Sequence, residues 1–170
     1  ALACRYRIVE QGKATRIGFP EVNLGIHPGW GGMIRAPRLL GGINGMQAIL
    51  TARLMDGDKA YRLGFADEKV PQRYLMKAAQ RWILQPPEKS SKRKCPGNFL
   101  NRISNKNWLR PWIGKKIRRT LVEKARADHY PAPYAALDLW QKWGSTTAQQ
   151  AFQQEAQSVA QLIVSPQAQN

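Results

Sequence analysis

Glu21 is the side chain of this sequence that is best placed for acid/base chemistry, because it stands between a Gly-Phe-Pro turn and a glycine-rich run. A helical pattern begins at Met33, so the amides of this run are expected near a helix N-terminus, where negative charge is favoured. A carboxylate beside unpaired amides suits proton transfer to or from water or an acyl group. The alternative is a Gly/Pro-rich turn with a solvated glutamate. Four glycines let these amides approach a ligand, since no Cβ intervenes and positive φ is allowed: Gly25, Gly29, Gly31 and Gly32.

Other candidate residues indicate less chemistry. His27 has no Ser or Cys nucleophile beside it, so a packed or surface histidine is favoured over a general base. His129 precedes a Tyr-Pro break and is expected to be structural. Cys4 and Cys95 are too few for a disulfide framework and fit a reducing compartment, and neither stands at metal-ligand spacing. No metal site is predicted, and no G-x-G-x-x-G run follows a strand, so no dinucleotide site is predicted either.

The framework around these residues is predicted to be mainly α-helical with one or two short strands. Residues 4–9 alternate apolar and basic side chains, which favours a strand. Asp58 is expected to cap a short helix over 59–63. Apolar residues at helical spacing predict further helices over 43–54, 71–84, 114–127 and 134–143, and a last helix that Ser145 or Thr146 caps, with Phe152, Ala156, Val159 and Ile163 as its apolar stripe.

The net charge of +16 is concentrated in residues 86–128, which carry 13 basic residues and only 3 acidic ones. Such an excess is typical of proteins that bind nucleic acid or an anionic surface. Trp108 and Trp112, interleaved with Lys and Arg, suit stacking on bases or contact with lipid. The other interpretation, which the family resemblance given below favours, is a connector that shields both tryptophans against the helical body, with residues 88–98 weakly packed. No apolar run approaches the roughly 20 residues of a membrane span.

The motifs resemble a known family. The run G-F-P-E-V-N-L-G-I-H-P-G-W-G-G at 18–32, followed by R-A-P-R-L-L-G-G, is similar to the signature of the enoyl-CoA hydratase/isomerase (crotonase) family. Further segments at 1–8, 50–54 and 59–71 follow the family's order. His129-Tyr-Pro-Ala-Pro-Tyr resembles a segment of multifunctional fatty-acid oxidation α-subunits, between the hydratase part and the dehydrogenase domain. The similarity covers residues 1–82 strongly and 128–164 moderately.

The resemblance implies a specific chemistry for Glu21 and Gly29. In this family two backbone amides hold the thioester oxygen of a 2-enoyl-CoA, and two glutamates position a water and shuttle its proton in a syn addition. Glu21 falls on the second of these glutamates, and the backbone amide of Gly29 falls on a position that helps to hold the water. The first glutamate and an oxyanion glycine belong to a Gly-Gly-Gly-x-Glu-Leu-Ala run that would lie immediately before Ala1. The isolated chain is therefore expected to be inactive.

The resemblance also implies how the chain is organised. We expect a truncated crotonase-like α/β fold plus a helical connector, cut from a longer protein: residues 1–85 as the C-terminal half of a hydratase domain, 86–130 as a basic tryptophan-containing connector, and 131–170 as a helical segment that leads to an absent dehydrogenase domain. The parent would be a cytoplasmic β-oxidation enzyme that hydrates trans-2-enoyl-CoA to 3-hydroxyacyl-CoA. The alternatives are a single-function isomerase or hydrolase of the family, and a basic module that binds nucleic acid or membrane.

Cofactors and partners follow from the same resemblance. The substrate would be a coenzyme A thioester, with no cofactor in this fragment and NAD in the parent's dehydrogenase domain. A thiolase subunit is an implied partner of the parent, while no specific nucleic acid and no transmembrane segment are expected. The helices at 43–54 and 71–84 would cover a β-spine that this chain does not contain, so their apolar faces are expected to pack helix on helix or to form a homodimer.

Overall fold

The computed structural model describes residues 1–86, 99–143 and 146–169. Within these residues the protein is mostly helical, as the sequence predicted, and it has one sheet of two short parallel strands. No described helix is both long and apolar enough to cross a membrane. The elements in chain order are β1 (Ile8–Glu10), the 3-10 helix η1 (Pro20–Leu24), α1 (Gly32–Leu40), α2 (Gly42–Leu50), α3 (Gly57–Arg62), β2 (Glu68–Val70), the 3-10 helix η2 (Gln72–Tyr74), α4 (Leu75–Leu84), α5 (Phe99–Ile103), α6 (Arg110–Lys124), α7 (Pro131–Lys142), α8 (Ala148–Ile163) and α9 (Pro166–Gln169).

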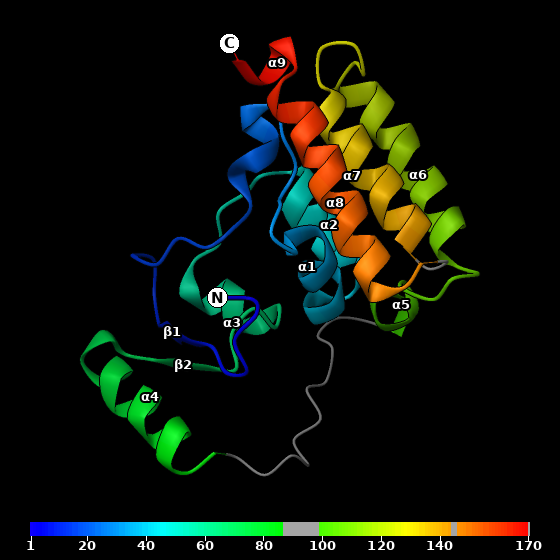
Figure 1. The fold of residues 1–170 in the computed structure, drawn as a ribbon. Helices are drawn as coiled ribbons and strands as arrows, with labels where there is room; N and C mark the ends of the chain where they lie inside the picture. Colours follow the sequence, from blue (N-terminus) through cyan, green and yellow to red (C-terminus); the bar gives the residue numbers. More distant parts are fainter. Residues whose placement is uncertain (87–98, 144–145, 170) are drawn as a thin grey trace.

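The small sheet and α4 form a lobe beside the main helical body (Figure 1). β1 pairs in parallel with β2, with Ile8 opposite Glu68. The predicted strand at 4–9 is confirmed only at its C-terminal end. The sequence did not reveal β2, because its Glu-Lys-Val segment is short and charged and depends on its partner strand. α4 rests on this sheet through the ring of Trp82, which meets Tyr6 edge-on at a centroid distance of 4.9 Å.

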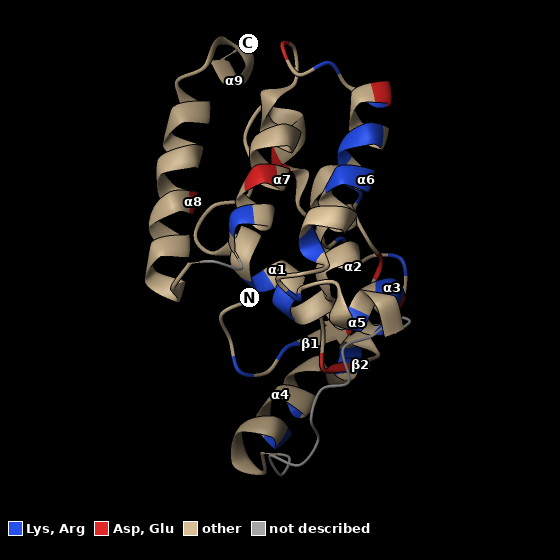
Figure 2. Ribbon diagram, turned by 90° about the vertical axis from the view of Figure 1, so that its right-hand side faces the viewer, with Lys and Arg blue, Asp and Glu red and all other residues tan. Residues whose placement is uncertain are grey.

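The main body is a layer of helices packed around α1 and α2. α6, α7 and α8 stand side by side in both views, with α7 in the middle (Figures 1 and 2). α7 and α8 pack against α1, and α7 also packs against α2. The centre of the body is formed by side chains that are at most 1% exposed: Leu40, Met46, Ile49, Leu137 and Trp140. Burying each such aliphatic side chain stabilises the fold by about 1.5–3 kcal/mol, so helix-on-helix packing gives this chain a core.

Two predicted helix caps are wrong by one or two residues. Asp56 caps α3, and its carboxylate accepts the Lys59 N–H at 2.7 Å. Asp58 instead lies inside the helix and pairs with the Lys69 ammonium at 2.5 Å. Thr147, not Thr146, caps α8 through a reciprocal pair of bonds with Gln150, whereas Ser145 lies outside the described residues. A cap must sit where its oxygen reaches a free N–H of the first turn, and composition alone does not fix that position.

The prediction that Trp108 and Trp112 are shielded is wrong. Trp108 is 68% exposed and Trp112 is 74% exposed. α6 turns its Gly114 side toward α7, where a Cβ at Gly114 would lie 2.3 Å from the side-chain amide of Gln141. Trp112 is two residues away from Gly114, about 200° around the helix, and therefore faces outward. The prediction of weak packing at 88–98 falls on residues outside the described ranges.

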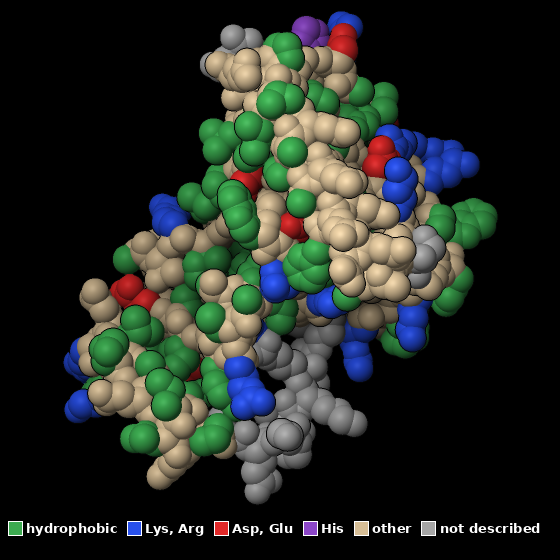
Figure 3. Space-filling model, in the orientation of Figure 1, with side chains coloured by type: hydrophobic (Ala, Val, Ile, Leu, Met, Phe, Trp, Pro, Cys, Tyr) green, Lys and Arg blue, Asp and Glu red, His purple; other side chains and the backbone are tan. Residues whose placement is uncertain are grey.

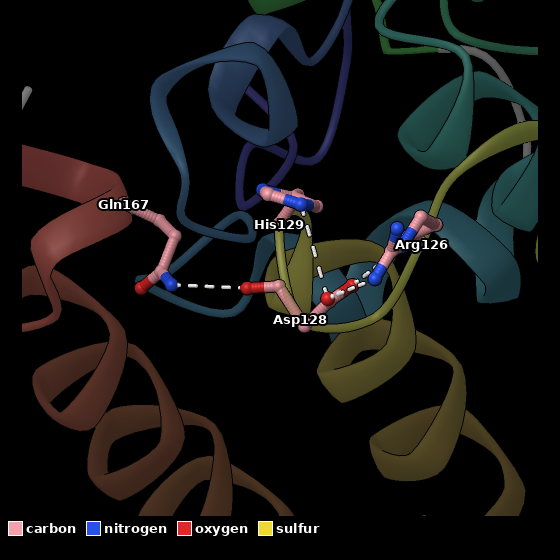
Figure 4. Close-up of polar contacts among 4 residues, drawn as sticks. All are labelled: Arg126, Asp128, His129 and Gln167. Carbon is pink, nitrogen blue, oxygen red and sulfur yellow. Dashed lines mark hydrogen bonds and ion pairs between the residues drawn. The ribbon is translucent and has the colours of Figure 1, made fainter.

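The loop between α6 and α7 is hydrogen-bonded to α9, the last helix of the chain. The Gln167 side-chain amide of α9 donates to the Asp128 backbone carbonyl at 3.1 Å, and the Arg126 guanidinium pairs with the Asp128 carboxylate at 2.7 Å (Figure 4). The His129 ring lies 3.8 Å from the same carboxylate and its side chain is 66% exposed. α9 also covers Gly25, where a Cβ would lie 2.6 Å from the Gln167 backbone oxygen.

Candidate functional site

Glu21 is held by a rigid turn. Pro20 opens η1, where its fixed φ suits a first helical position, and Gly25 closes the turn in the left-handed conformation with φ of 74°. The Phe19 ring anchors the turn by packing on Phe65 at a centroid distance of 5.5 Å. Glu21 itself is half-buried, and its Oε2 atom is buried with no hydrogen-bond partner among the described residues. A buried carboxylate oxygen without a partner is costly, which is typical of a group that meets a ligand or water.

Gly29 contributes a free backbone amide. Its carbonyl accepts the Gly32 N–H at 2.8 Å, while no hydrogen bond from the Gly29 N–H exists within the described residues. A Cβ at Gly29 would make only ordinary contact with Val159, at 3.8 Å. Gly31 differs, because its φ is +83° and a Cβ there would lie 2.6 Å from the Phe152 ring. The fold therefore requires a glycine at position 31, whereas at Gly29 a small side chain fits the fold.

Glu21 and Gly29 share one hollow of about 220 Å³, which is also lined by Ala1, Leu2, Ala3, Phe19, Pro28, Trp30, Gly31, Gly32 and Arg35. Glu21 is the one carboxylate of this lining and Arg35 is the one cationic side chain. The Arg35 guanidinium donates to the Trp30 carbonyl at 2.7 Å and lies over the Phe152 ring. The hollow thus combines a carboxylate, a free amide and a fixed cation, which together suit proton transfer to or from a bound water.

His27 is a packed histidine, as the sequence favoured. It is 0% exposed, its Nδ1 lies 3.0 Å from the Pro28 carbonyl, and its Nε2 lies 2.8 Å from the Ser158 hydroxyl. Because a carbonyl only accepts, Nδ1 carries the proton and Nε2 accepts from Ser158. Burial lowers the pKa of His27, which keeps the ring neutral. Its role is to bind α8 to the glycine-rich loop.

Glu155 helps to fix the glycine-rich loop, and nothing in the sequence analysis singled it out. It lies on α8, is 2% exposed, and accepts the Gly31 backbone N–H at the start of α1. Gly31 is the N-cap of α1 and has no side chain to cap the helix, so a carboxylate 124 residues away supplies the acceptor. Burial raises the pKa of Glu155, although the Gly31 amide opposes this shift.

A signal for Glu155 was present in the sequence. Glu155 stands three residues after Phe152 and four before Val159, on the predicted apolar stripe of the last helix. A carboxylate on a buried face needs a partner elsewhere in the fold. The predicted stripe is wrong at two of its four positions, since Ala156 and Ile163 are exposed, whereas Leu162 is buried.

The described residues contain no group of three or more His, Cys, Asp or Glu side chains that could hold a metal ion. Cys4 is a free, exposed thiol, and Cys95 lies outside the described ranges.

The sequence is similar to known proteins over nearly its whole length. A family model described as enoyl-CoA hydratase/isomerase matches residues 1–94. The chain is 32% identical over 165 residues to the fatty acid oxidation complex subunit alpha of Vibrio vulnificus, and 34% identical over 166 residues to that of Aliivibrio fischeri. These alignments cover 97% and 98% of this chain but 23% of each relative, so the chain spans about a quarter of their length.

Solved structures support the fold. A carnitinyl-CoA dehydratase from Mycobacterium thermoresistibile matches with a TM-score of 0.59 and 20% identity, covering 96% of this chain and 52% of that one. A carnitinyl-CoA hydratase from Mycobacterium avium matches with a TM-score of 0.55 and 17% identity, covering 99% of this chain and 50% of that one. The chain has the fold of about half of each structure.

Proposed function

Because the chain belongs to the enoyl-CoA hydratase/isomerase family, we propose that it forms part of an enzyme that adds water across the double bond of a trans-2-enoyl-CoA thioester. The product would be a 3-hydroxyacyl-CoA. The observation that carries the proposal is the hollow that Glu21 and Gly29 both line, together with the buried Glu21 Oε2 and the Gly29 N–H, neither of which has a hydrogen-bond partner among the described residues. The substrate is a coenzyme A thioester, and the reaction itself needs no further cofactor.

In this proposal Glu21 and Gly29 act on the water. The Gly29 N–H donates to the water oxygen, and the Glu21 carboxylate exchanges a proton with the reacting atoms. Hydration also needs a second carboxylate and amides that stabilise the negative charge on the thioester oxygen. The described lining of the hollow holds a single carboxylate, and Ala1, Leu2 and Ala3 lie in that lining. Because the chain spans about a quarter of the length of its relatives, we assign the missing groups to other parts of a longer parent protein, and we expect the isolated chain to be inactive.

The parent in this proposal is a multifunctional fatty-acid oxidation α-subunit of the cytoplasm. Similarity to proteins of that name over 97% of the chain supports it, because the match extends past the 1–94 region of the hydratase family model. Residues 1–85 would be the end of the hydratase domain, 86–130 the connector, and 131–170 the approach to an NAD-dependent dehydrogenase domain. A thiolase subunit would be its partner.

A second candidate is a single-function isomerase or hydrolase of the family. The same hollow could serve either reaction, but similarity to fatty acid oxidation complex α-subunits across the C-terminal helices favours the first proposal. Product analysis distinguishes them, because hydration gives a 3-hydroxyacyl-CoA, isomerisation a moved double bond, and hydrolysis free coenzyme A.

The isolated chain would also form a homodimer through α4. Three of its apolar side chains are left uncovered, with Met76, Ile83 and Leu84 being 72%, 75% and 79% exposed. Such a patch can be covered by a second copy related by a two-fold axis. Sedimentation at micromolar concentration tests this, and a monomer at all concentrations would contradict it.

Crotonyl-CoA hydration tests the catalytic proposal. The 170-residue chain should show no turnover above buffer, while the parent should be active. In the parent, Glu21→Gln should lower kcat by roughly 100-fold or more, the usual size of a lost acid/base group. Glu123→Gln, which removes an exposed carboxylate on α6, is the matched control and should leave kcat unchanged. An unchanged kcat for Glu21→Gln would reduce Glu21 to a loop residue, and turnover by the isolated chain would refute the need for further groups.

A further inference from the structure

One side of α6 presents tryptophans and cations together to solvent. We call this set of residues the α6 outer face: Trp108, Trp112, Lys115, Lys116 and Arg119. At 100° per residue, the four helical members lie on one side of α6, opposite the inward-facing Gly114 and Leu121. Trp108 lies in the turn just before α6, four residues ahead of Trp112. The two tryptophans are 68% and 74% exposed, although burying such rings is among the largest available sources of apolar stabilisation.

Among the described residues, no carboxylate lies within ion-pair distance of the cations of this face, although the exposed Glu123 is on the same side of α6. Arg118 pairs with Asp138 and Arg126 pairs with Asp128, so the fold does provide carboxylates for neighbouring arginines. In the part of the chain that the structure describes, no carboxylate forms an ion pair with Lys115, Lys116 or Arg119. Much of the α6 ribbon is coloured blue for Lys and Arg in Figure 2, and Lys and Arg side chains gather at the right-hand edge of Figure 3, with hydrophobic side chains just below them. The face therefore attracts an anionic partner.

An apolar groove runs beside the α6 outer face. It lies between α2 and α6, has a volume of about 440 Å³, and shares Lys116 with the face. Lys124 is a second cation in its lining. Most of the remaining lining is aliphatic: Ile43, Leu50, Leu100, Ile113, Ile117 and Leu121. Phe99, next to Leu100 on α5, is 73% exposed.

We propose that the α6 outer face and this groove dock on a membrane surface that bears anionic phospholipids. Exposed tryptophans favour the headgroup level of a bilayer, and each nearby Lys or Arg is attracted to anionic headgroups. The aliphatic groove takes acyl-chain contacts, while its two lysines lie close to lipid phosphate. Single-stranded nucleic acid would also use aromatic rings and cations, but it has no aliphatic part to fill such a groove. The groove therefore favours lipid over nucleic acid.

Vesicle binding by the 170-residue chain tests the proposal. Vesicles of phosphatidylcholine and phosphatidylglycerol in equal parts should bind the chain, and pure phosphatidylcholine vesicles should bind it far more weakly. Replacing Lys115, Lys116 and Arg119 together by Gln should weaken binding by roughly 100-fold at low salt. A control with the same loss of charge, at exposed positions outside α6, should change binding less than about threefold: Lys13→Gln, Arg16→Gln and Lys59→Gln.

The tryptophans give an independent readout. Binding should shift their fluorescence to the blue, and brominated lipid should quench it. Replacing Trp108 and Trp112 by Ala should abolish that quenching and leave binding that high salt removes. The matched control replaces Leu54 and Val164, which are 48% and 70% exposed, by Ala. It should bind as the unmodified 170-residue chain does.

Three outcomes would overturn the proposal. Equal losses in the two triple variants would mean that only the net charge of +16 attracts the vesicles. Binding to a labelled oligonucleotide that the α6 triple variant loses, without vesicle binding, would assign the face to nucleic acid. A change of sedimentation coefficient in the α6 variants, again without vesicle binding, would assign it to a contact between copies of the chain. None of these outcomes depends on the hydratase assay, because no residue of the α6 outer face lines the hollow of Glu21.

Discussion

Helices α6 and α8 each have a buried side and an exposed side, and each departs from the usual distribution of apolar and polar residues. The departure is on the buried side of α8 and on the exposed side of α6. α8 (Ala148–Ile163) carries polar groups on its buried side, and they are paired: Glu155 with the Gly31 amide and Ser158 with His27. α6 (Arg110–Lys124) carries large apolar groups on its exposed side, and Trp112 remains uncovered. The buried polar groups of α8 have their hydrogen-bond partners inside the molecule, whereas the exposed ring of Trp112 on α6 could be covered only by another molecule.

The pairing on α8 concerns the candidate site directly. Glu155 and Ser158 lie three residues apart, so both face the loop that contains Gly29. They hold the two ends of that loop, at His27 and Gly31, and the Gly29 amide between them has no hydrogen-bond acceptor among the described residues. A helix from the far end of the chain thus positions the loop that the hydratase proposal depends on.

Of the substitutions that test the contact between the loop and α8, Gly31→Ala is expected to have the largest effect. The left-handed φ of +83° and the Phe152 ring at 2.6 Å both oppose a methyl group there. Together they should lower the free energy of unfolding by about 2–4 kcal/mol, as measured by urea denaturation. Gly29→Ala is the matched control and should change it by less than about 0.5 kcal/mol. Equal effects of the two variants would show that the loop is not fixed as described.

A somewhat smaller, pH-dependent effect is expected from Glu155→Gln. Gln retains an oxygen for the Gly31 N–H but cannot ionise. Because burial raises the pKa of Glu155 in the folded protein, its favourable contribution is full below the unfolded pKa, near the ordinary value of 4.5, and is lost as pH rises through the raised pKa. Each unit of upward shift amounts to about 1.4 kcal/mol. The unmodified 170-residue chain should therefore lose stability relative to the Glu155→Gln variant as pH rises above the ordinary glutamate pKa of 4.5. Parallel stability curves would contradict the assignment.

Ser158→Ala should lower the free energy of unfolding by about 1 kcal/mol, because the buried His27 Nε2 loses its hydrogen-bond donor. Denaturation at pH 8 measures this while His27 is neutral.

A pH-dependent effect is expected at His27 itself. Burial lowers the pKa of His27, so its contribution to the free energy of unfolding is present above the ordinary value of 6.5 and is lost as pH falls below it. His27→Gln should remove that acid-side loss, and an unchanged acid-side slope would show that His27 does not titrate across this range.

The smallest effect on stability is expected on α6. Trp108→Ala and Trp112→Ala should each change the free energy of unfolding by less than about 0.5 kcal/mol, since both side chains are largely exposed. Trp140→Ala, at 1% exposure, provides the contrast and should lower it by about 3–5 kcal/mol. A large loss from either exposed tryptophan would mean that the fold covers the α6 outer face after all.

The sequence by itself determined what depends on neighbouring residues. The helices of the main body follow from the spacing of apolar side chains, and the turn around Glu21 follows from Pro20 and Gly25. The family was also legible, because its motifs are local runs of residues. The roles of Glu21 and Gly29 remain a prediction, but the expectation that the two lie together is consistent with their shared hollow.

Only the tertiary structure decided what depends on distant partners. β2 exists because it pairs with a strand 60 residues earlier, and Glu155 caps a helix whose N-cap is 124 residues away. Trp112 faces outward because Gly114 lets α6 approach α7 closely on the other side. In each case the free energy comes from groups that are remote in sequence. The pattern along a single segment could therefore not reveal which side of it would be covered.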